Sequence, residues 1–205
     1  MPKLVDPVVR RLDVVEALFR VVVRSGLQQA SLRAVADEAK LNIGSVRHYF
    51  DDQQELMRFA MQSMLDRVAA RLYRRVEELP AMGALSRPRR RQWVVDLLSE
   101  LLPLDDARRG EVIVWMEFTT AARINPVLDD LAQKSAAGTR SLVRQVLAGI
   151  LRAGLDLNVE TERLVALLDG LSINAVLRPD LLSAADCVAA LHTHLAELES
   201  GSAMK

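Results

Sequence analysis

The sequence predicts an all-α protein. Its apolar residues recur at spacings of three and four, as they do on one face of a helix, and no stretch alternates at every second residue as a strand does. Hydrophobic residues make up 50% of the 205 residues, whereas only nine are Gly and seven are Pro, and this composition favours helices. These helix breakers fall between the apolar stripes, so they mark the joints between successive helices.

The first helix is expected to begin at Pro7 and to end before Gly26. Asp6 precedes it as an N-cap, and proline is well tolerated at the first helical position because its missing N–H would have no partner there. Gly26 provides the stop. The apolar stripe of this helix consists of Leu12, Val15, Phe19 and Val22.

Two short helices and one long helix are expected next. Ser31 can cap a helix over residues 32–39, and a tight turn over residues 40–42 leads to a third helix over residues 43–49. A long fourth helix follows, with Asp51 or Asp52 as its N-cap, and ends near Glu78.

Proline and glycine divide the rest of the chain. Residues 79–92 contain two prolines and a glycine and are predicted to form a loop, whose four arginines are interpreted as solvent-exposed rather than as a phosphate site. Five further helices are expected at residues 93–102, 106–125, 126–153, 159–178 and 183–199, with residues 200–205 as a disordered tail.

The charges are distributed unevenly, although the formal net charge is zero. Residues 1–50 hold eight basic and five acidic side chains, so a surface that faces phosphate is expected at the N-terminal end. The single cysteine, Cys187, excludes an internal disulfide and fits a reducing compartment. No apolar run approaches the roughly 18 residues of a membrane span, and the signal-peptide pattern is missing, so a cytoplasmic protein without a membrane partner is expected.

No catalytic or metal-binding pattern occurs in the sequence. It contains no nucleotide-binding loop, no nucleophile elbow and no zinc motif. Cys187, His192 and His194 are close in sequence, but offsets of five and two do not place them on one face of a helix. We therefore expect no catalytic residue, no metal site and no cofactor.

The second and third helices form a helix-turn-helix pattern, in which the second helix of the pair enters the major groove of DNA. This helix begins with polar residues, and Asn42, Ser45 and Arg47 can present hydrogen-bond donors and acceptors to base edges. Its inner face would be anchored by Ile43, Val46 and Phe50. Gly44 is expected to leave space where the protein backbone comes close to DNA, and His48 and Tyr49 are expected to contact phosphate oxygens.

The run SLRAVADEAKLNIGSVRHYFDDQQEL, residues 31–56, resembles the DNA-binding segment of the TetR (tetracycline-repressor-like) family of bacterial regulators. The resemblance covers residues 8–56, and the segment LVALLDGLSINAVLRP (164–179) is similar to the branch that includes betaine and choline regulators. It implies a homodimer that represses transcription from a palindromic operator and is released by a small-molecule effector. The long fourth helix would carry the change between a DNA-binding domain (1–51) and a helical ligand-binding and dimerisation domain (52–199).

Three positions depart from the family pattern. Lys40 stands where the turn commonly has glycine, Arg47 where tyrosine is frequent, and Gln53 where a lysine is frequent. Arg47 can therefore make a bidentate contact with guanine, whereas Gln53 removes one charged contact with the DNA backbone. The residues expected to contact DNA are Ser31, Leu32, Arg33, Lys40, Asn42, Ile43, Gly44, Ser45, Arg47, His48, Tyr49 and Gln53.

The resemblance also implies an apolar effector pocket. The residues expected to line it are Phe59, Met64, Trp93, Trp115, Glu117 and Phe118. Glu117 lies in the otherwise apolar run VIVWMEFTTA, where an unpaired carboxylate is costly to bury. Either an internal cation, Arg123 or Arg140, pairs with it, or a cationic ligand does so, held near Trp115 and Phe118 by cation–π contact. The internal pair is the preferred alternative.

Two apolar stripes near the C-terminus are expected to form a four-helix dimer interface. They consist of Leu164, Leu167, Leu168, Leu171, Ala175, Val188, Leu191 and Leu195. The alternative is that both stripes pack only within one chain. Two other functions stay open at this point: a helical small-molecule-binding protein or enzyme that does not use its N-terminal fold on DNA, and a helical module that binds another protein.

Overall fold

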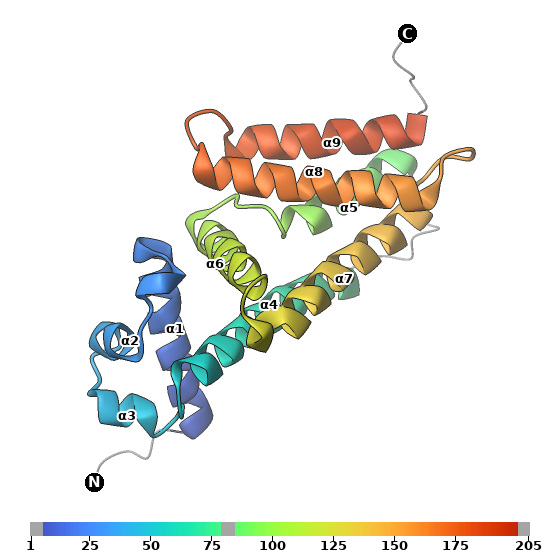
Figure 1. Cartoon of the computed structure of the whole chain (residues 1–205). Coiled ribbons are helices and arrows are strands. Elements are labelled where there is room, and N and C mark those ends of the chain that lie inside the picture. Colours follow the sequence, from blue (N-terminus) through green and yellow to red (C-terminus); the bar gives the residue numbers. More distant parts are fainter. Residues whose placement is uncertain (1–5, 79–84, 201–205) are drawn as a thin grey trace. The chain divides into compact units, whose positions relative to one another are not determined.

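The computed structural model describes residues 6–78 and 85–200. Within these ranges the chain forms nine α-helices, one short 3₁₀ helix and no strand (Figure 1), so the all-α prediction is confirmed. The helices are α1 (Pro7–Ser25), η1 (Leu27–Gln29), α2 (Leu32–Glu38), α3 (Ile43–Arg47), α4 (Gln53–Glu77), α5 (Arg87–Ser99), α6 (Asp106–Ala122), α7 (Pro126–Ala148), α8 (Leu157–Leu177) and α9 (Ala184–Ser200).

The chain packs as two compact units, each described here by itself. Unit 1 comprises the residues up to Asp66 together with Ile113–Gln133, and unit 2 comprises Arg67–Val112 and the residues from Lys134 onwards. Helices α4, α6 and α7 contribute residues to both units. The division into domains at residues 51 and 52 stays a prediction. The expected tail lies outside the described residues, except for Ser200, which is the last residue of α9.

Side-chain caps begin several helices where the sequence predicted them. Asp6 accepts a hydrogen bond from the backbone N–H of Val8 at 2.9 Å, and Ser31 accepts one from Ala34 at 3.2 Å. Between the two candidates for the α4 cap, Asp52 accepts from the N–H of Glu55 at 2.8 Å. Each cap satisfies an N–H that has no partner inside its helix, so the predicted starts are confirmed.

The predicted loop over residues 79–92 is wrong in its last six residues. Helix α5 begins at Arg87, so residues 87–92 are helical, and residues 79–84 lie outside the described part of the chain. Ser86 is the N-cap residue, and the following Pro88 lies in the first turn, where a proline does not interrupt helical hydrogen bonds. Other ends differ by two to five residues: α3 ends at Arg47, α6 at Ala122 and α7 at Ala148.

The core of unit 1 combines the helix-turn-helix segment with residues far along the chain. Helix α1 packs against α2, and α2 packs against α3. Val46 and Phe50 are 0% and 1% exposed, and they share this core with the fully buried Phe118 of α6 and Leu128 of α7. Burying a large apolar side chain stabilises a fold by about 1.5–3 kcal/mol. The segment is therefore held in part by residues beyond position 112.

Unit 2 is built around apolar residues of α5, α7, α8 and α9, with α5 and α8 both packed against α9. Charged contacts hold the beginning of α6 in this unit. Arg71 makes two hydrogen bonds to Glu111, at 3.0 and 2.7 Å, and Arg109 donates to the backbone oxygens of Ala175 and Val176, both at 2.9 Å. Arg109 thus caps the C-terminal end of α8, where carbonyl groups lack helical partners.

The described residues hold neither a membrane span nor a metal-binding cluster. None of the helices within residues 6–78 and 85–200 has the length and apolar character needed to cross a membrane. The same residues hold no group of three or more His, Cys, Asp and Glu side chains placed to bind a metal ion.

Candidate nucleic-acid interface

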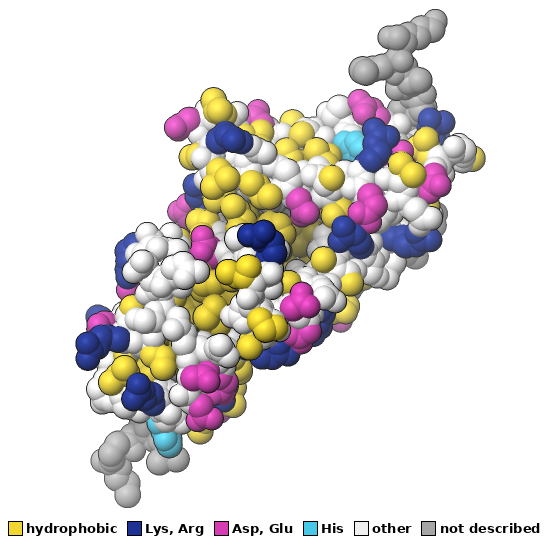
Figure 2. Space-filling view, in the orientation of Figure 1, with side chains coloured by type: hydrophobic (Ala, Val, Ile, Leu, Met, Phe, Trp, Pro, Cys, Tyr) yellow, Lys and Arg dark blue, Asp and Glu magenta, His cyan; other side chains and the backbone are white. Residues whose placement is uncertain are grey.

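Helices α2 and α3 and the turn between them present a polar surface above an apolar base. Figure 2 shows Lys and Arg side chains on the surface over α1 to α3. Seven of the twelve residues predicted to contact DNA are exposed: Ser31, Arg33, Lys40, Asn42, Gly44, Arg47 and His48. The other five, Leu32, Ile43, Ser45, Tyr49 and Gln53, are half-buried. Their contacts with DNA stay predictions.

The turn after α2 places Lys40 in the left-handed backbone region. Its φ of 57° is the one positive value at a residue other than glycine in the described chain. The N–H of Leu41 donates to the carbonyl of Ala36 at 2.9 Å, and that of Lys40 donates to Asp37 at 3.2 Å. This pair of bonds is a Schellman motif, which usually has glycine at the left-handed position. The turn therefore accepts the lysine side chain, which is exposed.

Asn42 has a structural task that the sequence analysis did not assign to it. Its Oδ1 accepts the backbone N–H of Ser45 at 2.7 Å and the Ser45 hydroxyl at 3.1 Å, so Asn42 is the N-cap of α3. The preference of asparagine for N-caps was the signal that could have indicated this. A Cβ added at Gly44 would lie 3.2 Å from the same oxygen, so glycine here also leaves room for the cap.

Gln53 and Tyr49 link α3 and α4 to the rest of unit 1. The Gln53 side-chain amide donates to the backbone oxygen of Ala30 at 3.1 Å, so this residue holds the segment before α2. Tyr49 packs against the core, and its ring meets the ring of His48 edge-on, with 5.0 Å between the centroids. The phosphate contacts of His48 and Tyr49 stay predictions.

Arg11 and Glu55 form an ion pair that contacts the segment directly after α3. The sequence did not single out either residue. Glu55 accepts a hydrogen bond from Arg11 and another from the backbone N–H of Asp51, both at 2.8 Å. The Arg11 guanidinium lies 4.5 Å from the ring centre of Phe50 and 4.3 Å from that of Phe59, within cation–π range. These partners are more than 35 residues from Arg11, so local sequence patterns could not reveal them.

Two arginines of α1 are tied to α2 through Glu38. Arg20 Nε and Arg24 Nη1 donate to the two carboxylate oxygens at 2.7 and 2.8 Å. Hydrogen bonds from Arg20 first and Arg24 second hold the pKa of Glu38 below its ordinary value. The positive charge near α2 is therefore partly compensated, and Arg33, Lys40 and Arg47 are the exposed cations of the α2–turn–α3 surface.

The six predicted pocket residues are divided between the two units. Met64 and Phe118 belong to the core of unit 1, and Phe59 and Trp115 pack against it, whereas Trp93 packs against the core of unit 2. Glu117 belongs to unit 1 as well. Their role in effector binding stays a prediction.

The partner of Glu117 in the structure is a backbone group. Its Oε2 accepts the N–H of Leu27 at 2.9 Å. Arg140, one of the two internal cations considered, pairs instead with Glu162 in unit 2, and this pairing raises the pKa of Arg140. A carboxylate is thus satisfied here by a main-chain donor, an alternative that the sequence analysis did not consider.

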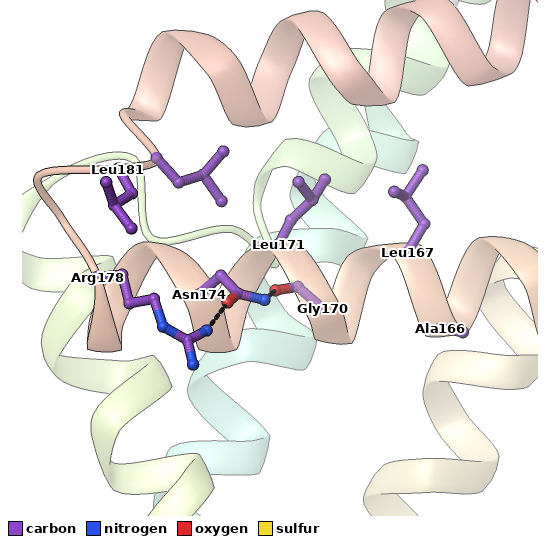
Figure 3. A pocket seen from close by; sticks show the side chains of 8 residues that line it. Ala166, Leu167, Gly170, Leu171, Asn174, Arg178 and Leu181 are labelled. Atoms are coloured by element: carbon purple, nitrogen blue, oxygen red, sulfur yellow. Dashed lines mark hydrogen bonds between the residues drawn. The ribbon is translucent and has the colours of Figure 1, made fainter.

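Most of the predicted dimer residues are buried within their own chain. Leu164, Leu168, Leu171, Ala175, Leu191 and Leu195 are at most 8% exposed in the core of unit 2, whereas Leu167 and Val188 are half-buried. An open, mainly apolar groove of about 490 Å³ lies beside them, along α8 and the segment after it (Figure 3). It is lined by Ala166, Leu167, Gly170, Leu171, Asn174, Arg178, Leu181 and Leu182.

The polar groups of this groove are occupied by one another. The Asn174 amide donates to the backbone oxygen of Gly170 at 2.7 Å, and its oxygen accepts a hydrogen bond from Arg178 (Figure 3). The remaining lining is apolar, and its Leu181 is 79% exposed, while Leu177, next to the lining residue Arg178 in the sequence, is 60% exposed. A contiguous apolar surface of this kind is typical of an interaction site.

Comparisons with known proteins agree on one family. Residues 90–199 match the family model described as "BetI-type transcriptional repressor, C-terminal". The chain is 34% identical over 181 residues to the HTH-type transcriptional regulator PksA of Bacillus subtilis (strain 168), covering 87% of this chain and 84% of the relative.

Solved structures give the same result. A transcriptional regulator from Rhodococcus sp. Rha1 superimposes with a TM-score of 0.80 at 30% identity, covering 93% of this chain and 96% of the other. A second structure, from Saccharomonospora viridis in complex with choline, has a TM-score of 0.78 at 19% identity, with coverages of 93% and 95%. At that identity the second likeness shows the fold alone.

Proposed function

Because this chain belongs to the TetR family and carries a BetI-type C-terminal region, it is a helix-turn-helix transcriptional regulator and not an enzyme, and we propose that it binds a palindromic operator as a homodimer. A small molecule that binds the C-terminal region would release it. We further propose that it acts in the cytoplasm, where bacterial DNA lies.

The observation that carries the proposal is the polar outer face of α3 above a buried apolar base. Val46 and Phe50 hold the helix against the core, while Arg47 and Asn42 are exposed on its outer side. Arg47 is proposed to contact guanine through two of its guanidinium N–H groups, because this is the most frequent specific contact in the major groove. Asn42 uses its oxygen as the helix cap, so its amide N–H₂ is the group left for an acceptor on a base.

The cations around α3 are proposed to bind phosphates. Arg33 and Lys40 are exposed on α2 and in the turn, where they can hold the protein on the DNA backbone without selecting a sequence. Each such contact releases counterions, so operator binding should weaken steeply as the salt concentration rises.

The dimer is proposed to form through the groove along α8, with a second copy of the chain as its occupant. The apolar lining includes the exposed Leu181, the exposed Leu177 precedes the lining residue Arg178, and a two-fold interface brings the same patch of both copies together. A Cβ added at Gly170 meets no atom within 4 Å, so the groove is open at this point. The buried leucines of the predicted stripes would then support α8 and α9 from within.

The effector is proposed to be a small cationic or amine-bearing compound, with choline as the first candidate. The support is the BetI-type match and the choline complex of the fold relative. Trp115, which precedes Glu117 by two residues on α6 and is half-buried, stays the proposed aromatic contact for such a cation. Thermal shift measurements with choline and with a neutral analogue of the same size would test the effector class.

The first test of DNA binding is selection of bound duplexes from a random-sequence library, run with the wild type, Arg47→Ala and Tyr49→Phe. We expect a palindrome whose half-sites are one or more helical turns apart, about 34–36 Å for a single turn. Arg47→Ala should lose preference at one base pair, worth ~1–3 kcal/mol. Tyr49→Phe, which keeps the half-buried ring, should weaken binding equally for all sequences. If no duplex is enriched at low salt, the proposal is wrong.

A further inference from the structure

The corner between α1 and α2 contains a buried backbone donor without a local partner. Gly26 leaves α1 with φ 83° and ψ 160°, and Leu27 then begins the three-residue helix η1. The first N–H of a helix has no acceptor within that helix. Leu27 is only 3% exposed, so water does not readily supply the missing acceptor.

A carboxylate from a distant part of the chain supplies the acceptor. Glu117 lies on α6, 90 residues further along the sequence, and its Oε2 is 2.9 Å from the nitrogen of Leu27. A hydrogen bond from an amide to a charged oxygen is about twice as strong as one between neutral groups. A Cβ added at Gly26 would lie 3.8 Å from the same oxygen, so the carboxylate is seated directly against the corner.

The place of this bond connects it to DNA recognition. The corner joins α1 to α2, and α2 carries the turn and α3, which present the exposed polar residues. If the Leu27 N–H loses its acceptor, the backbone between α1 and α2 gains conformational freedom. DNA binding must then fix the positions of α2 and α3 relative to α1. Binding energy spent on that ordering is lost from the affinity.

We propose that Glu117 is a positioning residue for operator binding, which sets the corner between α1 and α2 through the Leu27 N–H. This inference rests on the proposed function in unit 1. It also gives α6, whose other end belongs to unit 2, a chemically defined contact with the helix-turn-helix segment. A change at α6 that withdraws the carboxylate would weaken DNA binding without touching α3.

Three variants test the proposal in the full-length protein. Glu117→Met has nearly the same length and suits a helix, but it offers no oxygen. Glu117→Gln keeps an oxygen that can accept the Leu27 N–H. Glu111→Met is the matched control, because Glu111 is also on α6 but pairs with Arg71 in unit 2. The selected operator serves as the DNA probe, and amide hydrogen exchange at Leu27 reports the contact itself.

In Glu117→Met, the Leu27 amide should exchange its hydrogen roughly tenfold faster than in the wild type, and the operator affinity should fall roughly tenfold. Both changes follow because an unsatisfied buried donor is costly. Glu117→Gln should remain within about threefold of the wild type in both measurements. Glu111→Met should lower the melting temperature without a comparable loss of affinity, which separates positioning from general stability.

Three outcomes would overturn the inference. These are unchanged Leu27 exchange in Glu117→Met, unchanged operator affinity in a variant whose Leu27 amide has become exposed, or equal losses of affinity in Glu117→Met and Glu111→Met. If the wild type itself binds no selected duplex, the proposed function fails rather than the contact, and the exchange at Leu27 still decides whether the contact exists.

Discussion

Replacing Lys40 with glycine should raise the stability of the protein while it weakens DNA binding. The left-handed conformation costs an L-residue about 1–2 kcal/mol, and Lys40 adopts it with a φ of 57°. Glycine removes that strain but loses ~0.5–1 kcal/mol through the greater freedom of the unfolded chain. The two ranges leave a net gain of about 0–1.5 kcal/mol, and a chain of this length gains about 2–4 °C in melting temperature per kcal/mol.

The same substitution removes one positive charge from each protomer. Each phosphate contact contributes about 0.9 to the slope of log affinity against log salt, so a homodimer that loses two contacts should show a slope lower by about 1.8. Circular dichroism during heating measures the first effect. Fluorescence anisotropy with the selected operator at several salt concentrations measures the second.

Lys40→Ala is the matched control, because it removes the charge and keeps the strain. It should reproduce the change in slope without the rise in melting temperature. A glycine variant that melts below the wild type would refute the strain argument. An unchanged slope in both variants would show that Lys40 does not contact phosphate.

Three further predictions follow from other positions. Gly26→Ala should destabilise the fold by roughly 1–3 kcal/mol, because the backbone conformation at Gly26 is almost restricted to glycine. Gly138→Ala in α7 should instead stabilise the fold slightly. Changes in melting temperature of the same sign in both variants would contradict this. Gly170→Leu should convert a dimer into a folded monomer in light scattering, with Gly138→Leu as the control that stays dimeric. Glu38→Gln should lower the melting temperature at neutral pH. The pKa of Glu38 is depressed in the folded state, so its ion pairs stabilise the protein fully at a pH above the ordinary glutamate range. The difference in melting temperature from the wild type should therefore vanish as the pH falls through the depressed pKa. A difference that persists in acid would be inconsistent with the ion pairs to Arg20 and Arg24.

The sequence was sufficient for several helix starts that a local signal determines. The caps Asp6, Ser31 and Asp52 each act on an N–H two or three residues away, so short windows revealed them. The start of α5 was missed although its signal was also local. Pro88 was interpreted as a loop residue, whereas proline in a first turn after a serine favours a helix start.

Contacts between distant residues could not be predicted from the same patterns. The run around Glu117 indicated a carboxylate that needed a partner, but the Leu27 N–H is a backbone group, which carries no sequence signal. The stripe that includes Leu164 and Leu168 was assigned to a dimer, yet these residues are 0% and 2% exposed within one chain. Periodicity shows that a helix face is covered but does not show whether the cover belongs to the same molecule.

Unit 1 is built from two separate segments of the chain, and this limits which parts of the regulator can be exchanged with those of another protein. In the chain order, the boundary before the long helix α4 is the obvious place to exchange a DNA-binding segment for that of another repressor. Here such an exchange at residue 51 would separate Phe50 and Val46 from Phe118 and Leu128, which share one core with them. A chimera should keep Ile113–Gln133 together with its own helix-turn-helix segment, or redesign both sides of that core at once. Modularity in this protein therefore follows the packing and not the order of the chain.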